Sequence, residues 1–501
     1  MDTPTDDFDV LEASVADVHG AIEAGAITVR RLVDRYLDRI DAYDDDLNAI
    51  LRVNPRARER ADELDERYRD EGFVGPLHGV PVILKDNHDT GDMPTTAGSK
   101  TLADSQPPRD AFVVEQLRDA GAVVVAKANL QEFSFGVDTI SSLGGATRNA
   151  YALDRRPSGS SGGTAAAVAA NLATVGTGSD TCSSVRSPPA FNSLVGLRPT
   201  RGLVSRTGIV PLSETQDTAG PITRTVADAA RLLEVMVGYD PEDPVTATGV
   251  GRVPEDGYVS HLDGDGLDGA RIGVVREFFE LADEANASEG ATSVLEVVED
   301  AIDEMAAAGA TVVDPVEVVD SEYLGSARVL SYEFKRDLER YLSELGDAAP
   351  TDSFAELVES GEIAPSVAER ITDGDILDVD VASLDENLEY LQALDRRRQI
   401  AVDTADRMVQ LDLDALLYPP STVPPVEIPD HQPFEELRCE LAAHTGFPAI
   451  VVPAGFTDDG LPVGVELLGR AFAEPRLLEL AYAYEQASDH RRPPERFGPT
   501  E

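Results

Sequence analysis

The apolar positions near the start of the chain recur with helical spacing. Residues 10–71 carry this pattern, and Thr28 is placed to cap a helix within them. The apolar positions after it, at spacings of four, four and three, are Leu32, Tyr36, Ile40 and Tyr43. Such spacing puts side chains on one face of a helix. We therefore expect this segment to form helices that pack on the rest of the chain.

Short apolar runs follow, each bounded by turn residues. Residues 80–84 read Val-Pro-Val-Ile-Leu and predict a buried strand with Lys85 at its end. Residues 111–119 predict an amphipathic helix and residues 123–126 another strand, which is an α/β unit. The same order of helix, glycine and strand returns in residues 301–313.

Residues 157–189 differ from the segments before them because they are mostly Gly, Ser, Thr and Ala. The middle of this segment, 164–172, is rich in Ala and Val and predicts a helix buried on most sides, after a Gly/Ser loop at 158–163. A flexible linker would share the glycines and serines but not the alanine-rich helix or the apolar run at 194–197. We therefore favour a packed core element.

The remainder of the chain continues the α/β pattern. Residues 240–268 are rich in Asp, Gly and Pro and predict a surface excursion, and an acidic helical stretch covers 288–410. Residues 447–453 and 461–468 predict two more buried strands. Helices that alternate with short apolar strands over the whole length predict one α/β domain around a central sheet.

The net charge of the chain indicates a strongly acidic surface. The 42 Lys and Arg against 93 Asp and Glu leave a formal charge of −51, while 42% hydrophobic residues suffice for a large core, unlike an acidic disordered protein. This balance argues against binding nucleic acid or anionic membranes through a general basic surface. Only four lysines occur, so the composition favours a protein adapted to high salt, with an acidic protein of an ordinary cell as the alternative.

Location is predicted from what the sequence lacks. Cys182 and Cys439 make neither a disulfide framework nor a zinc cluster, which is consistent with a reducing cytoplasm. Residues 1–9 are acidic and unlike a signal peptide, and no run reaches the roughly 18 apolar residues of a membrane helix. We expect a soluble cytoplasmic protein without membrane contact.

Two features are candidates for chemistry. Lys85 follows an apolar strand, and burial there would lower the pKa of its amine and make it available as a base; an ordinary salt bridge, to Asp86 or another carboxylate, is the alternative. Serine-rich clusters at 158–164 and 178–186 bracket the predicted buried helix and could place their serines side by side. Each cluster alone could equally be a helix-capping turn.

Together these segments resemble the amidase signature family of Ser-Ser-Lys hydrolases. The lysine segment is Leu-His-Gly-Val-Pro-Val-Ile-Leu-Lys-Asp-Asn at 77–87, and the Gly-Ser-Ser-Gly-Gly loop with its alanine-rich helix lies at 159–170. Further similarity lies at 180–186, 195–200, 217–225 and 445–469. The resemblance covers most of the chain and is weakest at about 240–410.

The resemblance implies a role for each residue of the site. Ser184 would be the nucleophile, Ser160 the bridging serine and Lys85 the base, with no cofactor and no metal. The oxyanion-hole and substrate-binding positions would be Thr181, Cys182, Ser183 and Ser184. The supporting residues would be Asp180, Arg186 and Ser161. The family usually has two glycines where this chain has Cys182 and Ser183, so we expect a narrower pocket.

The resemblance also implies a fold: an α/β/α sandwich around a large mixed, largely parallel central sheet. We expect an N-terminal helical segment at 1–72, a catalytic core at 73–240, a variable helical and pocket region at 241–420 and the C-terminal part of the core at 421–501, all within one catalytic domain. Loops at about 90–140 and 320–440 should supply the pocket walls.

Other chemistries are less consistent with the sequence. The loop at 159–163 formally contains the nucleophile elbow of α/β-hydrolases, with Ser161 as nucleophile, but no strand precedes it. Cys182 has no adjacent histidine to activate a thiol, and His78 and His88, ten residues apart, make a poor metal site.

Three functions remain open within the resemblance. A stand-alone amidase acting on a small amide, without direct nucleic-acid contact, is favoured by residues 89–99 and 47–50, whereas 129–133 is ambiguous. The second is the glutaminase A subunit of an aminoacyl-tRNA amidotransferase. The third is a non-catalytic binding or assembly subunit. The sequence leaves a homo-oligomer open.

Overall fold

The computed structural model describes residues 8–351 and 353–500. Most of the acidic N-terminal stretch that argued against a signal peptide, residues 1–7, lies outside this part. The strands are β1 (Ile50–Val53), β2 (Pro81–Lys85), β3 (Val123–Ala128), β4 (Ile140–Ser141), β5 (Gly145–Ala146), β6 (Val175–Asp180), β7 (Val195–Arg198), β8 (Thr218–Thr223), β9 (Arg271–Val274), β10 (Thr311–Val313), β11 (Ala415–Tyr418), β12 (Ala449–Phe456) and β13 (Pro462–Leu468).

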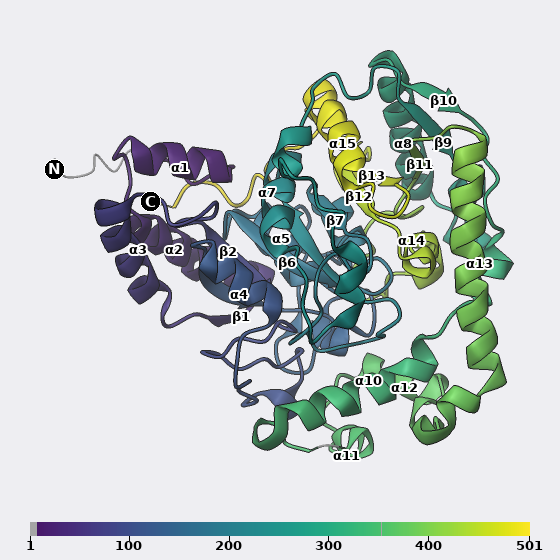
Figure 1. Cartoon of the computed structure of the whole chain (residues 1–501), viewed down its shortest axis with the longest axis horizontal. Helices are drawn as coiled ribbons and strands as arrows, with labels where there is room; N and C mark the ends of the chain where they lie inside the picture. The colour runs from purple at the N-terminus through teal and green to yellow at the C-terminus, as the bar shows by residue number, and fades with distance from the viewer. Residues whose placement is uncertain (1–7, 352, 501) are drawn as a thin grey trace.

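Helices surround these strands. They are α1 (Val15–Glu23), α2 (Val29–Leu47), α3 (Ala57–Glu71), α4 (Phe112–Asp119), α5 (Gly162–Ala169), α6 (Ser187–Phe191), α7 (Val226–Met236), α8 (Glu289–Ala307), α9 (Ser321–Gly325), α10 (Leu330–Leu345), α11 (Phe354–Glu359), α12 (Pro365–Asp373), α13 (Leu388–Gln410), α14 (Glu440–Thr445) and α15 (Glu474–Ser488). Figure 1 shows α1–α3 on one side of the sheet and the long α13 on the other. No helix of the described residues is both long and apolar enough to cross a bilayer.

One large mixed sheet organises the molecule, as expected. Its eleven strands follow the order β1-β3-β2-β6-β8-β7-β12-β13-β11-β9-β10. The neighbours β3-β2-β6 and β11-β9-β10 run parallel, and the other neighbours run antiparallel. The parallel pairing of β2 with β6 brings the carboxyl ends of these two strands together, and both strands lead into the serine and lysine motifs.

Local sequence patterns located most of these elements. Strands β2, β3, β12 and β13 and helices α4 and α5 begin and end within three residues of the predicted positions. The helical prediction for residues 10–71 missed β1, whose Ile50 pairs with Ala128 at the edge of the sheet. Strand β1 has only four residues, and a run this short carries no periodicity that could separate it from a helix.

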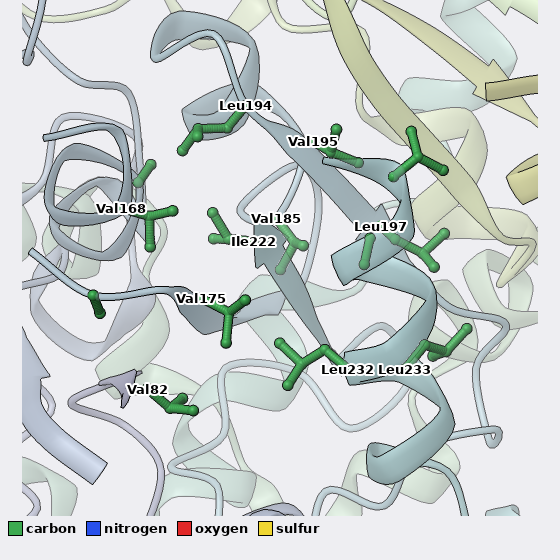
Figure 2. Close-up of a cluster of buried hydrophobic side chains, with 14 of the residues drawn as sticks. Val82, Val168, Val175, Val185, Leu194, Val195, Leu197, Ile222, Leu232 and Leu233 are labelled. Atoms are coloured by element: carbon green, nitrogen blue, oxygen red, sulfur yellow. The ribbon is translucent and has the colours of Figure 1, made fainter. Parts of the chain in front are cut away.

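The predicted small-residue helix α5 lies in the core. All eight of its residues are buried, and Figure 2 shows Val168 of this helix facing Ile222 and Val175 of the sheet. A Cβ at Gly163 would overlap the backbone of Asn129, and one at Gly176 would overlap Thr164. Only small residues therefore allow α5 to approach the sheet this closely, and the approach places the preceding serine loop against the end of β6.

Candidate active site

Lys85 ends β2 as a buried residue that points at two serines. Its Nζ lies 2.7 Å from Ser160 Oγ and 2.9 Å from Ser179 Oγ. Ser179 belongs to β6, the parallel neighbour of β2, and its hydroxyl also accepts a hydrogen bond from Asn87 Nδ2 at 2.8 Å. The sheet register therefore fixes the amine beside Ser179, and the loop before α5 brings Ser160 to it.

The electrostatics of Lys85 favour the neutral amine. Burial lowers the pKa of Lys85 to about 7, although the negative charges of Asp180 and Asp217 act in the opposite direction. Asp86, the partner that an ordinary salt bridge would use, instead pairs with Lys127 at 3.0 Å. Near neutral pH, a large fraction of Lys85 is thus available to accept a proton.

The serine loop before α5 holds Ser160 beneath the surface. The peptide bond between Gly159 and Ser160 is cis, and the Ser160 carbonyl accepts a hydrogen bond from the backbone N–H of Gln131 at 3.0 Å. Ser161, next along the loop, donates from Oγ to the Ser179 carbonyl at 3.3 Å. Ser161 is therefore directed at the end of β6, whereas Ser160 contacts Lys85 at the end of β2.

Ser184 lies in the loop between β6 and α6 and is 6% exposed. It lines a cavity of about 240 Å³, so a substrate carbonyl can reach its hydroxyl. Among the contacts of residues 8–351 and 353–500, no hydrogen bond joins Ser184 Oγ to Ser160 Oγ. The structure thus brings Lys85 and Ser160 into direct contact and places Ser184 in the wall of the cavity.

The backbone around Ser184 presents free donors. Among the described contacts, the N–H groups of residues 182–184 have no hydrogen-bond acceptor. The ends of this stretch are fixed: Thr181 Oγ1 donates to Asp217 at 2.5 Å, and Val185 N donates to Asp180 Oδ2 at 2.9 Å. A fixed loop with unused N–H groups is the arrangement that an oxyanion hole requires.

Asp180 and Arg186 hold this loop from beneath. Asp180 accepts hydrogen bonds from Arg186 Nε at 3.3 Å and from Arg198 Nη1 at 2.6 Å, and Arg186 also pairs with buried Glu466. Burial raises the pKa of Asp180, but the charges of Arg186 and Arg198 outweigh it and hold that pKa below its ordinary value. Asp180 therefore stays ionised at neutral pH.

The two cysteines are joined, which corrects the expectation that they form no disulfide framework. Cys182 and Cys439 form a disulfide across 257 residues of sequence, with their Cα atoms 5.0 Å apart. Cys182 thus offers no free thiol as a nucleophile. Nothing in the local sequence links the two positions, because their proximity arises only when α14 packs beside the loop that follows β6.

Part of the cavity wall comes from the two regions expected to supply it, about 90–140 and 320–440, and the rest comes from residues 181–184, from Leu212 and Gln216, and from His444. Its apolar lining includes Phe135, Val137, Leu212, Leu330 and Phe434. Its polar lining includes Gln216, Arg328, Arg370, Glu440 and His444. Arg328 pairs with Glu440, whereas Arg370 forms no ion pair with any described residue. The cavity therefore combines apolar walls with one uncompensated positive charge.

Sequence reasoning missed several residues of this site. Ser179, which contacts Lys85, lies inside a serine cluster whose pattern does not separate the roles of its members. Gln216 donates from Nε2 to the Thr181 carbonyl at 2.9 Å, a contact without any local sequence signal. No group of three or more His, Cys, Asp or Glu side chains in the described residues is arranged to hold a metal ion.

Comparison with known proteins places the chain among amidases. The sequence pattern of the family described as Amidase matches residues 31–478. A probable amidase of Arabidopsis thaliana is 35% identical, over 97% of this chain and 92% of that protein, and the A subunit of the glutamyl-tRNA(Gln) amidotransferase of Alkaliphilus metalliredigens is 34% identical, over 95% of this chain and 96% of that protein. The solved peptide amidase of Stenotrophomonas maltophilia has a TM-score of 0.86 at 39% identity, with 97% of this chain and 98% of that chain covered.

Three findings give one assignment. The family pattern matches most of the chain, the probable amidase is similar in sequence, and the peptide amidase is similar in fold. The chain belongs to the amidase family and is a hydrolase that acts on amide C–N bonds.

Proposed function

We propose that this amidase hydrolyses a carboxylic amide through an acyl-enzyme on Ser184, with Ser160 as the bridging serine and Lys85 as the base. The observation that carries the proposal is the 2.7 Å contact between Lys85 Nζ and Ser160 Oγ. It joins a buried amine, whose pKa is lowered to about 7 chiefly by burial, to a buried hydroxyl. An ammonium with an ordinary pKa could not accept a proton at neutral pH.

In the proposed reaction, protons move from Ser184 through Ser160 to Lys85 and later return along the same side chains. Lys85 takes a proton from Ser160, Ser160 takes one from Ser184, and Ser184 Oγ attacks the amide carbonyl. The N–H groups of residues 182–184 stabilise the oxyanion, a contribution of about 3–4 kcal/mol per donor in other enzymes. The proton returns to the leaving nitrogen as the C–N bond breaks, and water then hydrolyses the ester to release the acid.

The site favours a free-standing enzyme for small amides. Phe135, Leu330 and Phe434 suit an apolar portion of the substrate, and a cavity of about 240 Å³ limits its size. A peptide amidase and a probable amidase are among the similar proteins. The similarity to amidotransferase A subunits keeps glutaminase chemistry inside a complex as the second candidate. Glutamine hydrolysis that requires both tRNA and another protein chain would favour that second candidate.

The proposal is tested with two serine variants. Ser184→Ala should lower kcat for simple aliphatic and aromatic amides by at least about a thousandfold, because the nucleophile is lost. Ser161→Ala is the matched control, since it removes a hydroxyl of the same motif that does not touch Lys85. A Ser184→Ala protein as active as the parent would refute the assignment. A non-catalytic subunit on the same scaffold would leave the parent itself inactive on all amides.

The salt concentration in which the enzyme works, its cellular location and its domain organisation are also proposals. The formal charge of −51 supports function in high salt. The cytoplasmic location stays a prediction, and the Cys182–Cys439 disulfide removes the thiol argument on which it partly relied. A single catalytic domain, with its core at 73–240 and 421–501 and its pocket region at 241–420, likewise stays a prediction.

A further inference from the structure

A second cavity shares His444 with the cavity of Ser184 and is lined by arginines. It measures about 450 Å³, and its basic lining consists of Arg201, Arg397 and Arg398, with no Asp or Glu in its walls. In a chain with 93 acidic and 42 basic residues, a pocket with three arginines and no carboxylate is unexpected.

None of the three arginines is neutralised. Among the described residues, no carboxylate forms an ion pair with Arg201, Arg397 or Arg398. Arg397 is 4% exposed and donates only to neutral oxygens, those of Gln216, Ala327 and Ala443. Burial lowers the pKa of Arg397 to about 9, and the charge of Glu333 only partly opposes this effect.

Glu333 does not take the place of a counterion in the cavity. It accepts hydrogen bonds from Ser213, Thr215 and Tyr390, and Arg336 lies 3.6 Å from it. Its oxygens are thus already engaged by other donors. A buried arginine without a paired charge costs free energy, and an anion in the cavity would remove much of that cost.

An unpartnered side chain points to the same ligand. His444 is 5% exposed, its Nδ1 has no hydrogen-bond partner, and it lines both this cavity and the one that contains Ser184. Helices α13 and α14, which carry Arg397 and His444, pack side by side in Figure 1. The two helices therefore bring a buried cation without a paired carboxylate and a ring nitrogen without a partner to the lining of one cavity.

We propose that this cavity binds a small oxyanion, an anion that carries a phosphate or carboxylate group. Guanidinium groups donate pairs of parallel hydrogen bonds to such groups. The volume lies within the roughly 300–1,000 Å³ of small-molecule sites. Arg398 and Thr248 are exposed, so an anion can enter from solvent.

Hydrogen bonds connect this cavity to the loop that carries Ser184. Arg397 Nη1 donates to Gln216 Oε1 at 2.8 Å, and Gln216 Nε2 donates to the carbonyl of Thr181 at 2.9 Å. An anion that draws on Arg397 changes the hydrogen bonding that positions Thr181. We therefore expect the anion to change kcat as well, a consequence that rests on the proposed function.

Binding is tested without reference to activity. Sodium phosphate, and separately sodium acetate, is titrated into the full chain by isothermal calorimetry, with KCl adjusted to hold the ionic strength constant. We expect saturable binding of one anion per chain by the parent. Arg398→Gln should weaken it at least about tenfold, because a charge-assisted donor is lost from a side chain with no structural contact. The acetate titration shows whether a carboxylate suffices or a phosphate is required.

Two control variants locate the binding. Arg407→Gln makes the same charge change further along α13, outside the cavity, and Arg370→Gln makes it in the cavity of Ser184. Both should bind phosphate as the parent does. No saturable binding of either anion by the parent, parent-like binding by Arg398→Gln, or loss in Arg370→Gln instead would each overturn the proposal. If the anion binds as proposed but Ser184→Ala keeps full activity, only the proposed function fails.

Discussion

Cys182 and Cys439 form a disulfide that ties the loop between β6 and α6 to the start of α14. Cys182 lies two residues before Ser184 in this loop. The loop positions 182–184 carry the free N–H groups proposed for the oxyanion hole. A covalent link at this point limits how far the loop can move away from the cavity wall formed by Glu440 and His444. The side chain that replaces a family glycine at position 182 thus serves as an anchor.

Removing this disulfide should loosen the loop and destabilise the fold. The double variant Cys182→Ser/Cys439→Ser should lose about 2–4 kcal/mol of unfolding free energy in urea denaturation, because the link constrains a long loop of the unfolded chain. Its kcat should fall more than its KM rises. Alkylation under denaturing conditions is the direct check: no cysteine should react before reduction and two after it. Two reactive thiols in the untreated protein would contradict the disulfide.

The pKa of Lys85 predicts the pH profile. Burial lowers this pKa to about 7, so the neutral amine grows tenfold per pH unit below that value. The rate kcat/KM should therefore rise with unit slope up to about pH 7 and level off above it. Lys85→Ala should be inactive at neutral pH and recover partly at high pH. An unchanged profile in the variant would exclude Lys85 as the base.

The lowered pKa of Lys85 also makes the unfolding free energy depend on pH. The folded-state pKa of Lys85 lies below the unfolded value of about 10.4, so the unfolded chain binds more protons between pH 7 and that value. This contribution makes unfolding free energy rise with pH across the window. Lys85→Met should lack it, which urea denaturation of both proteins at pH 7 and pH 9 would reveal.

Ser179→Ala should act through Lys85. Ser179 Oγ accepts a hydrogen bond from Lys85 Nζ at 2.9 Å, which stabilises the ammonium. Without this acceptor, the pKa of Lys85 should fall and the midpoint of the pH profile should move to lower pH. Ser161→Ala is the control, because its hydroxyl bonds to the Ser179 carbonyl and not to the amine. Equal midpoints in both variants would remove Ser179 as a positioning residue.

Asp180→Asn should be strongly destabilising. The change leaves Arg186 and Arg198 buried without their shared carboxylate, at a cost of about 3–5 kcal/mol in urea denaturation. Asp46→Asn, which breaks an exposed pair with Arg496, should cost about 1 kcal/mol or less.

Because the pKa of folded Asp180 is depressed, its stabilising effect is complete above about pH 4 and is lost as the pH falls through the folded value. Similar costs for the two variants would contradict this account.

The acidic surface predicts a salt requirement. Repulsion within a net charge of −51 is screened as KCl rises from about 0.1 to 1 M, where the Debye length falls from about 10 to 3 Å. The unfolding temperature should rise over this range. Potassium and sodium chloride should act alike, since screening depends on ionic strength. An unfolding temperature independent of salt would remove the argument for a high-salt protein.

Local patterns were enough to predict much of the fold. Strand β2 could be predicted because five apolar or proline positions precede Lys85, and α5 because small residues fill every position of a helix that approaches the sheet closely. The resemblance at residues 77–87, 159–170 and 180–186 pointed to the residues of the proposed site. Each of these signals lies within about a dozen neighbouring residues.

Tertiary structure alone decided the contacts that join distant segments. Cys182 meets Cys439 across 257 residues, and Arg397 meets Gln216 across 181. Neither pair has a periodicity or motif, because each arises from how α13 and α14 pack against loops at the ends of the sheet strands β6 and β8. The arginine cavity follows from the same packing. The sequence determined which residues carry the proposed chemistry, and the packing of distant helices decided what anchors them and which charges remain unpaired beside them.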